Sequence, residues 1–579
     1  MIYHTFSFQN LPAHQLVPYL NHFMEQESSS LLPWHVCWLN NDSEQVIGLL
    51  PKTSWTAYKN ALPQSKSTST TPLLDIEILK TLRQVPSDQI DAYQRSNLKT
   101  SNLTSKLEST SNDNKAHSAT IANTINSRSV NYSIEYKKWI EELIGYCKSN
   151  VNLGQNSSLN LEGQAEDRAV ADSDTFQSGL MGFIGYDIGA QALAVGSKIE
   201  IAEQPCAFLA HYDIYLKPYT DKSGPDIKWA LHTEDNTPQI LQDSMVAYLQ
   251  AFEAQLTVLL TQSVTFPSTP PALPLKPVWN FEQYTQAFNK TQQYLHQGDS
   301  YQINLTQKWQ GQLSLSTFTP NDTLTHCKPC LRLVDYLPQL HHKTQAPFAG
   351  YLGITNMAPT AKKQSISEFE LLSCSPELFV LFNKNAEGQQ QIITKPIKGT
   401  LPRGVNAERD EQLKQQLAMS DKDKAENVMI VDLLRNDLGK YAEIGSVNVP
   451  KLFTIESFSN VHHMVSTITA TIKEEHHPLT VLFNSLPAGS ITGTPKKRAV
   501  EIISELEVAP RGAYCGTLGY MNFDGTGQWN VLIRSLQADS QGKVALWAGG
   551  GITVGSECSA EYQECHDKVG NLVTVLDPQ

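Results

Sequence analysis

The feature that most constrains the fold is a recurring order of strand pairs and helices in the C-terminal half of the chain. Residues 368–382 and 391–397 have the patterns of strands, and a polar turn joins them. Helical patterns flank this pair at residues 281–298, which end at a glycine, and at residues 413–434. Strand pairs between helices predict an α+β fold with antiparallel sheets and not a doubly wound one.

Shifts in composition predict how the chain is divided. Residues 65–129 and 150–174 are rich in Ser, Thr and Asn, and they contain little apolar surface to offset the entropy of ordering. We expect mostly disordered insertions there, with one candidate helix over residues 74–82. A Pro-rich stretch predicts a linker. The expected division is an N-terminal region, a linker and a C-terminal domain, at residues 1–265, 266–277 and 278–579.

Charge and cysteine content narrow the function classes. The formal net charge is −13, and acidic and basic residues are mixed along the chain, which argues against nucleic acid as the main ligand. No apolar run reaches the length of about 18 residues that a transmembrane helix needs, and we expect neither a membrane span nor a signal peptide. Nine scattered cysteines fit reduced thiols and therefore a cytoplasmic protein.

Lys398 is the first candidate for chemistry. It lies on a short strand-like segment that a Gly-Thr turn and a Pro-Arg-Gly follow. A buried lysine loses its proton easily and becomes a nucleophile. This segment alone leaves a solvated loop lysine open as the alternative.

Glu377 is the second candidate, because it lies where a strand meets a proline turn and apolar residues follow. A carboxyl group held against apolar neighbours has a raised pKa and can act as a general acid. An exposed turn glutamate is the alternative.

Three glutamates are candidates for a magnesium site. Glu426 lies on a strongly apolar helix, where a charge is costly unless it is paired or bound to metal. Glu561 and Glu564 are three residues apart and share a helix face. Mg²⁺ prefers a few carboxylates together with water and an anionic substrate. A solvated acidic face is the alternative, and Lys568 is either a helix pair for Glu564 or a cation for the substrate.

Two segments have the character of anion sites. Residues 488–498 place glycines and Thr494 before a helix start, whose free backbone N–H groups attract anions. Gly549, Gly550 and Gly551 end a strand and can cradle a carboxylate with backbone N–H groups, or can form a β-bulge instead. Together with the candidates above, these segments indicate a small dicarboxylate ligand.

These segments resemble the chorismate-utilising enzymes, closely from residue 281 to the C-terminus and weakly before it. The resemblance implies two orthogonally packed antiparallel sheets flanked by helices, with the C-terminal domain as the catalytic one. Within this family, Pro396-Ile397-Lys398-Gly399-Thr400 is similar to the P-I-K-G-T of aminodeoxychorismate synthases. Anthranilate synthases have P-I-A-G-T there, and their component I is the closest alternative; an isochorismate synthase and a non-catalytic chorismate-binding protein are more distant ones.

The resemblance also implies a mechanism. Lys398 would add its amine to C2 of chorismate while Glu377 protonates the departing C4 hydroxyl, and ammonia would then add at C4 to give 4-amino-4-deoxychorismate, the precursor of p-aminobenzoate and folate. Glu426 with Glu561 or Glu564 would hold Mg²⁺. The implied substrate-binding residues are Thr400, His463, Gly493, Tyr520, Arg534, Gly549, Gly550, Gly551 and Lys568.

Two further expectations come from the resemblance. The chain lacks the G-x-C-x-G motif of a glutamine amidotransferase, so a separate amidotransferase subunit would supply the ammonia and form a heterodimer with it. The second is a tryptophan-type pocket in the N-terminal region. Its walls would be formed by Pro33, Trp34, Asn40, Pro347 and Phe348. The family's L-L-E-S motif is absent and Asn40 replaces an expected small residue, which speaks against tryptophan binding there.

Overall fold

The structure is a computed structural model. It describes residues 4–27, 35–42, 44–59, 74–100, 125–153, 175–220, 226–261, 270–313, 332–354, 369–458 and 461–578.

Two antiparallel sheets of twelve strands each form the centre of this described part of the chain. In spatial order the first sheet contains β1 (His4–Phe6), β10 (Ile227–Thr233), β9 (Ile214–Thr220), β3 (Glu44–Gly48), β2 (Cys37–Asn41), β13 (Phe348–Ile354), β14 (Phe369–Ser375), β23 (Ser535–Asp539), β24 (Lys543–Ile552), β12 (Gln302–Gln312) and β11 (Lys276–Pro277), with β20 (Gly493–Thr494) beside β12.

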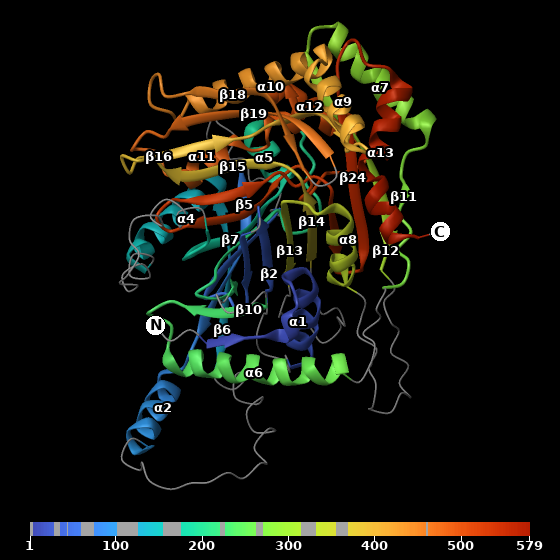
Figure 1. The fold of residues 1–579 in the computed structure, drawn as a ribbon. Coiled ribbons are helices and arrows are strands. Elements are labelled where there is room, and N and C mark those ends of the chain that lie inside the picture. Colours follow the sequence, from blue (N-terminus) through green and yellow to red (C-terminus); the bar gives the residue numbers. More distant parts are fainter. Residues whose placement is uncertain are drawn as a thin grey trace.

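The second sheet contains β17 (Ile397–Pro402), β19 (Val461–Thr471), β16 (Gln390–Thr394), β15 (Leu378–Lys384), β22 (Gly527–Asn530), β21 (Thr517–Asn522), β7 (Gly179–Ile184), β8 (Ala207–His211), β4 (Thr53–Lys59), β5 (Asp75–Gln84) and β6 (Asn126–Glu135), with β18 (Asn448–Ser457) beside β19. In Figure 1 β15, β16, β18 and β19 of this sheet run across the view, whereas β12, β13, β14 and β24 of the first sheet stand upright.

Helices cover the outer surfaces of the two sheets (Figure 1). They are α1 (Ala13–Glu27), α2 (Ser87–Thr100), α4 (Tyr136–Asn150), α5 (Tyr186–Leu193), α6 (Gln239–Thr261), α7 (Phe281–His296), α8 (Leu337–Thr344), α9 (Ala407–Ala418), α10 (Asp421–Gly439), α11 (Pro478–Ser485), α12 (Lys496–Leu506) and α13 (Cys558–Leu576). The predicted α+β fold with antiparallel sheets is confirmed. No helix in the described ranges is long and apolar enough to cross a membrane.

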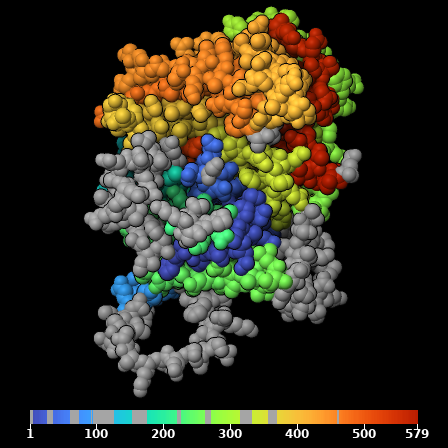
Figure 2. Space-filling view, in the orientation of Figure 1, coloured from blue at the N-terminus to red at the C-terminus, as the bar shows by residue number. Residues whose placement is uncertain are grey.

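In both sheets, strands from distant parts of the sequence pair with each other. In the first sheet β2 pairs with β13, so that Trp38 lies opposite Tyr351. In the second sheet β7 pairs with β21, so that Phe183 lies opposite Leu518. Figure 2 shows that residues after about 370 form the upper part of the molecule and that N-terminal residues form much of the lower part. The predicted linker at 266–277 is described only from residue 270, and its end forms β11 beside β12.

The expectation for residues 74–82 was wrong, because this segment is strand β5 and not a helix. Ile76 and Ile78 are buried, whereas Asp75 is exposed and Glu77 is partly exposed. This is the alternation of a strand. β5 pairs along its whole length with β6, which begins inside the predicted insertion at 65–129. Residues 101–124 of that insertion, and residues 154–174 of the other, lie outside the described ranges.

The apolar core fills the space around both sheets. Trp38, Trp55, Trp139 and Trp229 have no more than 2% of their surface exposed. Full burial of a large apolar side chain stabilises a fold by about 1.5–3 kcal/mol. This core fixes β17, β24, α10 and α13, which carry the candidate site.

Candidate active site

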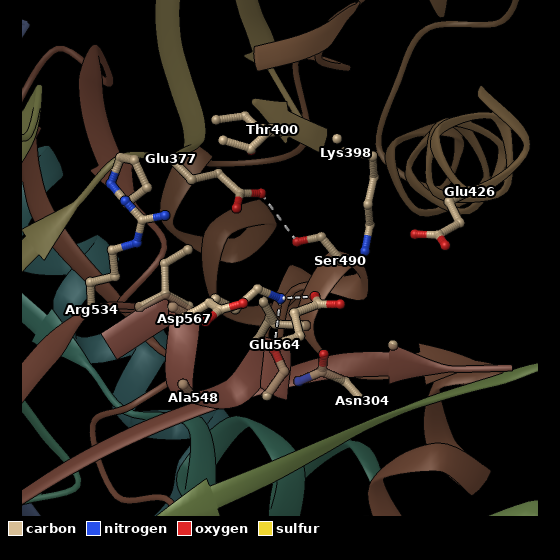
Figure 3. Close-up of a pocket in the computed structure, with 18 of the residues that line it drawn as sticks. Asn304, Glu377, Lys398, Thr400, Glu426, Ser490, Arg534, Ala548, Glu564 and Asp567 are labelled. Atoms are coloured by element: carbon tan, nitrogen blue, oxygen red, sulfur yellow. Dashed lines mark hydrogen bonds and ion pairs between the residues drawn. The ribbon is translucent and has the colours of Figure 1, made fainter. Parts of the chain in front are cut away.

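One cavity contains most of the candidate residues. Its volume is about 510 Å³, and its walls come from β12, β17 and β24 and from α10 and α13. Figure 3 shows Glu377, Lys398, Glu426, Arg534 and Glu564 around it. Two helices and the edges of both sheets therefore bring together residues that are up to about 260 positions apart, as Asn304 and Glu564 are.

Lys398 enters the cavity from an irregular part of β17. Ile397 is opposite Val465 on β19 and Thr400 is opposite His463, so three residues of β17 span two of β19 and the register shifts between them. Gly399 has φ +84°, and a Cβ atom there would lie 2.8 Å from Cγ of Asp423. This bulge turns the side chain of Lys398 toward the cavity (Figure 3). A larger residue at position 399 would therefore shift the side chain of Lys398.

Withdrawal from bulk water also changes the chemistry of Lys398. Burial lowers the pKa of its amine, and the carboxylate of Glu426 is the strongest influence in the opposite direction. A lowered pKa increases the fraction of neutral amine, which is the nucleophilic form.

Glu377 lies at the junction of β14 and β15, directly after Pro376. Only 7% of its surface is exposed. Burial raises the pKa of its carboxyl group to about 7, although Lys398 and a hydrogen bond from Ser490 favour the ionised form. The Ser490 hydroxyl donates to Oε1 at 3.4 Å, which is a long hydrogen bond. A carboxyl group with this pKa keeps its proton in a substantial fraction of the molecules at neutral pH, and that fraction can act as a general acid.

Glu561 and Glu564 project from the first turns of α13 against the backbone of β24. A Cβ atom on Gly550 would lie 2.7 Å from Oε2 of Glu561 and 3.3 Å from Oε1 of Glu564. A side chain at position 550 would therefore displace the carboxylate of Glu561. Ser556 donates to Oε1 of Glu561 at 2.7 Å. Burial and the neighbouring Glu564 raise the pKa of Glu561, so these two carboxylates share one electrostatic environment that favours a bound cation.

Lys568 lies one turn beyond Glu564 on α13. Its ammonium group is 2.5 Å from Oε1 of Glu564 and donates to the carbonyl oxygen of Gly549 at 2.8 Å. Burial would raise the pKa of Glu564, but Lys568, Lys422 and Lys398 together outweigh burial, and the pKa is lowered.

Glu426 stands apart from the two α13 glutamates. It projects from α10, and Figure 3 shows it beyond Lys398, on the side away from Glu377. The exposed Lys422 lies 3.9 Å from its Oε1. Within the described ranges, no three of the His, Cys, Asp and Glu side chains converge closely enough to hold a metal ion by themselves. Two convergent carboxylates on α13 nonetheless fit Mg²⁺, which commonly takes one or two protein carboxylates and fills its other positions with water and an anionic ligand.

Thr400, His463 and Arg534 complete the wall near Glu377. His463 Nδ1 and Thr400 Oγ1 are 2.8 Å apart. Burial and the charge of Arg534 lower the pKa of His463 to about 4, so its imidazole is neutral at neutral pH. Arg534 therefore supplies the positive charge in this wall.

Three predicted substrate-binding residues are not in the cavity wall. Tyr520 is 1% exposed and packs edge-on against Phe176 in a separate apolar cluster, because its side chain on β21 points between the sheets. Gly493 pairs with Ile303, and a Cβ there would lie 2.0 Å from the carbonyl oxygen of Gln302. The lack of a side chain at Gly493 therefore allows β20 to pair with β12. Gly550 faces Glu561 and Glu564. Gly549, Gly551, Thr400, His463, Arg534 and Lys568 do line the cavity.

The predicted tryptophan-type pocket is only partly described. Pro33 and Trp34 lie outside the described residues. Asn40 is buried, and its amide donates to the carbonyl oxygen of Ala346 at 3.2 Å. Pro347 and Phe348 follow directly, and the Pro347 carbonyl accepts a hydrogen bond from the backbone of Asp42. These three residues are therefore neighbours, and the pocket stays a prediction.

Several cavity residues were not predicted from the sequence. They are Asn304, Lys422, Asp423, Ser490, Tyr514, Trp547 and Asp567. Asp423 and Asp567 could have been found, because each is three residues from a predicted glutamate and so shares its helix face. The rings of Tyr514 and Trp547 stack with centroids 5.8 Å apart, and no sequence spacing indicates that contact.

The chain is similar to known proteins over much of its length. Residues 131–574 match the family described as chorismate binding enzymes. Aminodeoxychorismate synthase component 1 of Escherichia coli is 37% identical over 406 residues, which cover 69% of this chain and 78% of that protein. Anthranilate synthase component 1 of Bacillus subtilis is 39% identical over 225 residues, which cover 39% of this chain and 42% of that protein.

A solved structure extends the comparison to the fold. The crystal structure of anthranilate synthase component I from Streptococcus pneumoniae superposes on 74% of this chain and 85% of its own chain, with a TM-score of 0.52 and 23% sequence identity. At this identity the likeness concerns the fold alone, and it agrees with the architecture expected from the sequence.

Proposed function

This chain belongs to the family of chorismate-binding enzymes, and we propose that it is the chorismate-converting component of an aminodeoxychorismate synthase. The observation that carries the proposal is Lys398, whose amine enters the same cavity as the buried carboxyl group of Glu377. A neutral amine and a protonated acid are the two groups that a displacement of an allylic hydroxyl requires.

The cavity has a cationic group on each side for an anionic substrate. Arg534 lies near Glu377, and Lys568 lies near the backbone of Gly549. Chorismate has two carboxylates, and these cations would bind them and hold the ring between Lys398 and Glu377. Mg²⁺ held by Glu561, Glu564 and Glu426, directly or through water, would supply further positive charge for a substrate carboxylate when bound.

The proposed reaction has two steps. The nitrogen of Lys398 forms a bond to C2 as the ring double bond shifts and the C4–O bond breaks, and Glu377 donates its proton so that water leaves. Ammonia then forms a bond to C4, the double bond shifts back, and the C2–N bond breaks to release the lysine amine. The ammonium group formed at C4 gives one proton back to the carboxylate of Glu377. The product is 4-amino-4-deoxychorismate, which leads to p-aminobenzoate and folate.

We further propose that the ammonia comes from a glutamine amidotransferase subunit. The sequence contains no G-x-C-x-G motif of that enzyme class, and the E. coli relative is named as a component 1. The scattered cysteines favour the cytoplasm as the compartment of this reaction.

Product identification tests the proposal. The purified chain would be incubated with chorismate, Mg²⁺ and excess ammonium at mildly alkaline pH, and products would be followed by mass spectrometry and a pyruvate assay. Aminodeoxychorismate without pyruvate is the expected result. Isochorismate would contradict it, as would no turnover even with an amidotransferase subunit present.

Anthranilate synthase component I is the second candidate, because a relative of that name is 39% identical over 225 residues. The same incubation separates the two, since anthranilate forms together with pyruvate. Lys398 argues for the first candidate, because a nucleophilic lysine has no part in direct attack by ammonia on C2.

A further inference from the structure

The ammonium group of Lys568 is bonded to a carboxylate oxygen that a cation between the two α13 glutamates would need. Oε1 of Glu564 and Oε2 of Glu561 are the oxygens that approach the backbone at Gly550. Oε1 of Glu564 is also the atom that Lys568 contacts at 2.5 Å. Two positive groups cannot share this oxygen closely without strong repulsion. A divalent cation at the α13 pair and Lys568 at its present position therefore compete.

The surroundings of Lys568 allow its ammonium group to move away from Glu564. Its second contact is a single backbone carbonyl, that of Gly549. Of its side chain, 41% is exposed, and it borders the cavity that would bind the substrate. A lysine has a flexible four-carbon stem with rotatable donors, so it can exchange one anionic partner for another within reach. A substrate carboxylate in the cavity is such a partner.

We propose that Lys568 couples cation binding to substrate binding at this site. It occupies Oε1 of Glu564 until a carboxylate of the substrate draws its ammonium group away, and that oxygen is then free for the divalent cation. The proposal rests on the proposed function for the identity of the anion, chorismate. Because linkage is reciprocal, the cation must also tighten the binding of chorismate by the same factor.

Mn²⁺ is a suitable probe, because it takes the same oxygen ligands as Mg²⁺ and its free form has a strong paramagnetic resonance signal. The full chain would carry Lys398→Met in every sample, so that chorismate is not consumed through the proposed lysine adduct. Mn²⁺ affinity would be measured with and without saturating chorismate, with saturation checked by calorimetry. The variants are Lys568→Met and, as a control that also removes one positive charge, Lys384→Met. Lys384 is 40% exposed, lies 3.0 Å from Asp524 and does not line the cavity.

The proposal predicts that chorismate tightens Mn²⁺ binding by about tenfold when Lys568 is present, within the usual range of couplings. Lys568→Met should bind Mn²⁺ about tenfold more tightly without chorismate, and the added effect of chorismate should fall at least about threefold. Lys384→Met should leave the effect of chorismate unchanged. Lys568→Arg keeps a cationic donor and should preserve the coupling. It is the variant to measure if Lys568→Met does not fold.

Three results would overturn the proposal. They are Mn²⁺ binding to Lys568→Met that is no tighter than to Lys384→Met, an unchanged effect of bound chorismate in Lys568→Met, and no Mn²⁺ binding to any variant. None of these depends on the product formed with ammonium. A failed coupling and a failed assignment of the reaction are therefore distinguishable.

Discussion

Two buried carboxyl groups of this molecule show opposite behaviour. Asp213 is fully buried beside β9, and Glu377 is 7% exposed in the cavity. Arg83 donates to Oδ2 of Asp213 at 2.5 Å and Thr237 donates to the same oxygen at 3.0 Å. Glu377 has the long hydrogen bond from Ser490 at 3.4 Å. Burial disfavours both anions, but Arg83 lowers the pKa of Asp213, whereas the pKa of Glu377 rises to about 7.

The difference lies in what each cluster contacts. Asp213 belongs to a structural network in which His211 and Glu234 also pair, with His211 Nε2 2.7 Å from Oε1 of Glu234. Around Glu377 and Lys398 a cavity takes the place of such partners. Removal of one partner from a buried charged pair destabilises a fold, whereas buried groups that face a cavity keep altered pKa values that serve chemistry.

The largest expected effect comes from removal of the nucleophile. Lys398→Ala should lower the rate of aminodeoxychorismate formation by about a thousandfold or more, because the covalent route is lost. The fold should persist, since the side chain faces a cavity. Steady-state kinetics and circular dichroism would check both points. Lys384→Ala, at an exposed pair with Asp524, is the control, and equal rates in the two variants would contradict the role of Lys398.

Glu377→Gln should lower the rate by about 10²–10⁴-fold, the usual contribution of general acid catalysis. In the unmodified protein the rate of lysine adduct formation should fall as pH rises through about 7, because Glu377 then loses its proton. The variant should lack this alkaline limb. Adduct formation measured without ammonium avoids the titration of ammonia itself. An alkaline limb that survives in Glu377→Gln would assign it to another group.

In the structural network the expected effect is on stability. Arg83→Met should cost about 3–5 kcal/mol of unfolding free energy, because Asp213 then remains buried without its partner. The rate per folded molecule should not change. Urea unfolding would measure the loss, and Lys384→Met, which breaks an exposed pair, should cost less than about 1 kcal/mol.

The pH dependence of stability should also differ between the clusters. The folded pKa of Asp213 is lowered below its unfolded value. Its contribution is therefore present above the unfolded pKa, about 3.9 for a free aspartate, and is lost as pH falls through the folded pKa. Arg83→Met should remove this part of the acid sensitivity, and an identical acid-unfolding curve would speak against the network.

The smallest expected effect is that of Ser490→Ala. Its hydrogen bond to Glu377 favours the ionised form, so removal should raise the pKa of Glu377 further and move the alkaline limb to higher pH. The rate itself should change by less than about tenfold, as for a single neutral hydrogen bond. A limb that moves to lower pH would show that Ser490 acts in another way.

The sequence predicted the fold class and the centre of the site, and its failures have physical causes. Strand pairs between helices sufficed for the α+β fold, and the segments around Glu377, Lys398 and Glu561 sufficed for the cavity. The strand β5 was missed because polar residues surround it, although Ile76 and Ile78 alternate. Tyr520 lies outside the cavity wall, and its strand position in the sequence does not reveal which face of the strand meets the cavity. Ser490 and Tyr514 reach the cavity through long-range packing, which local patterns do not contain.

The central claim is that Lys398 bonds to the substrate, and intact-protein and peptide mass spectrometry test it most directly. The chain would be mixed with chorismate and Mg²⁺ without ammonium and quenched rapidly. We expect a mass increase equal to chorismate less one water, located on the peptide that contains Lys398, and its disappearance when ammonium is added. Turnover to aminodeoxychorismate with no such adduct at any time, or an undiminished rate in Lys398→Ala, would contradict it.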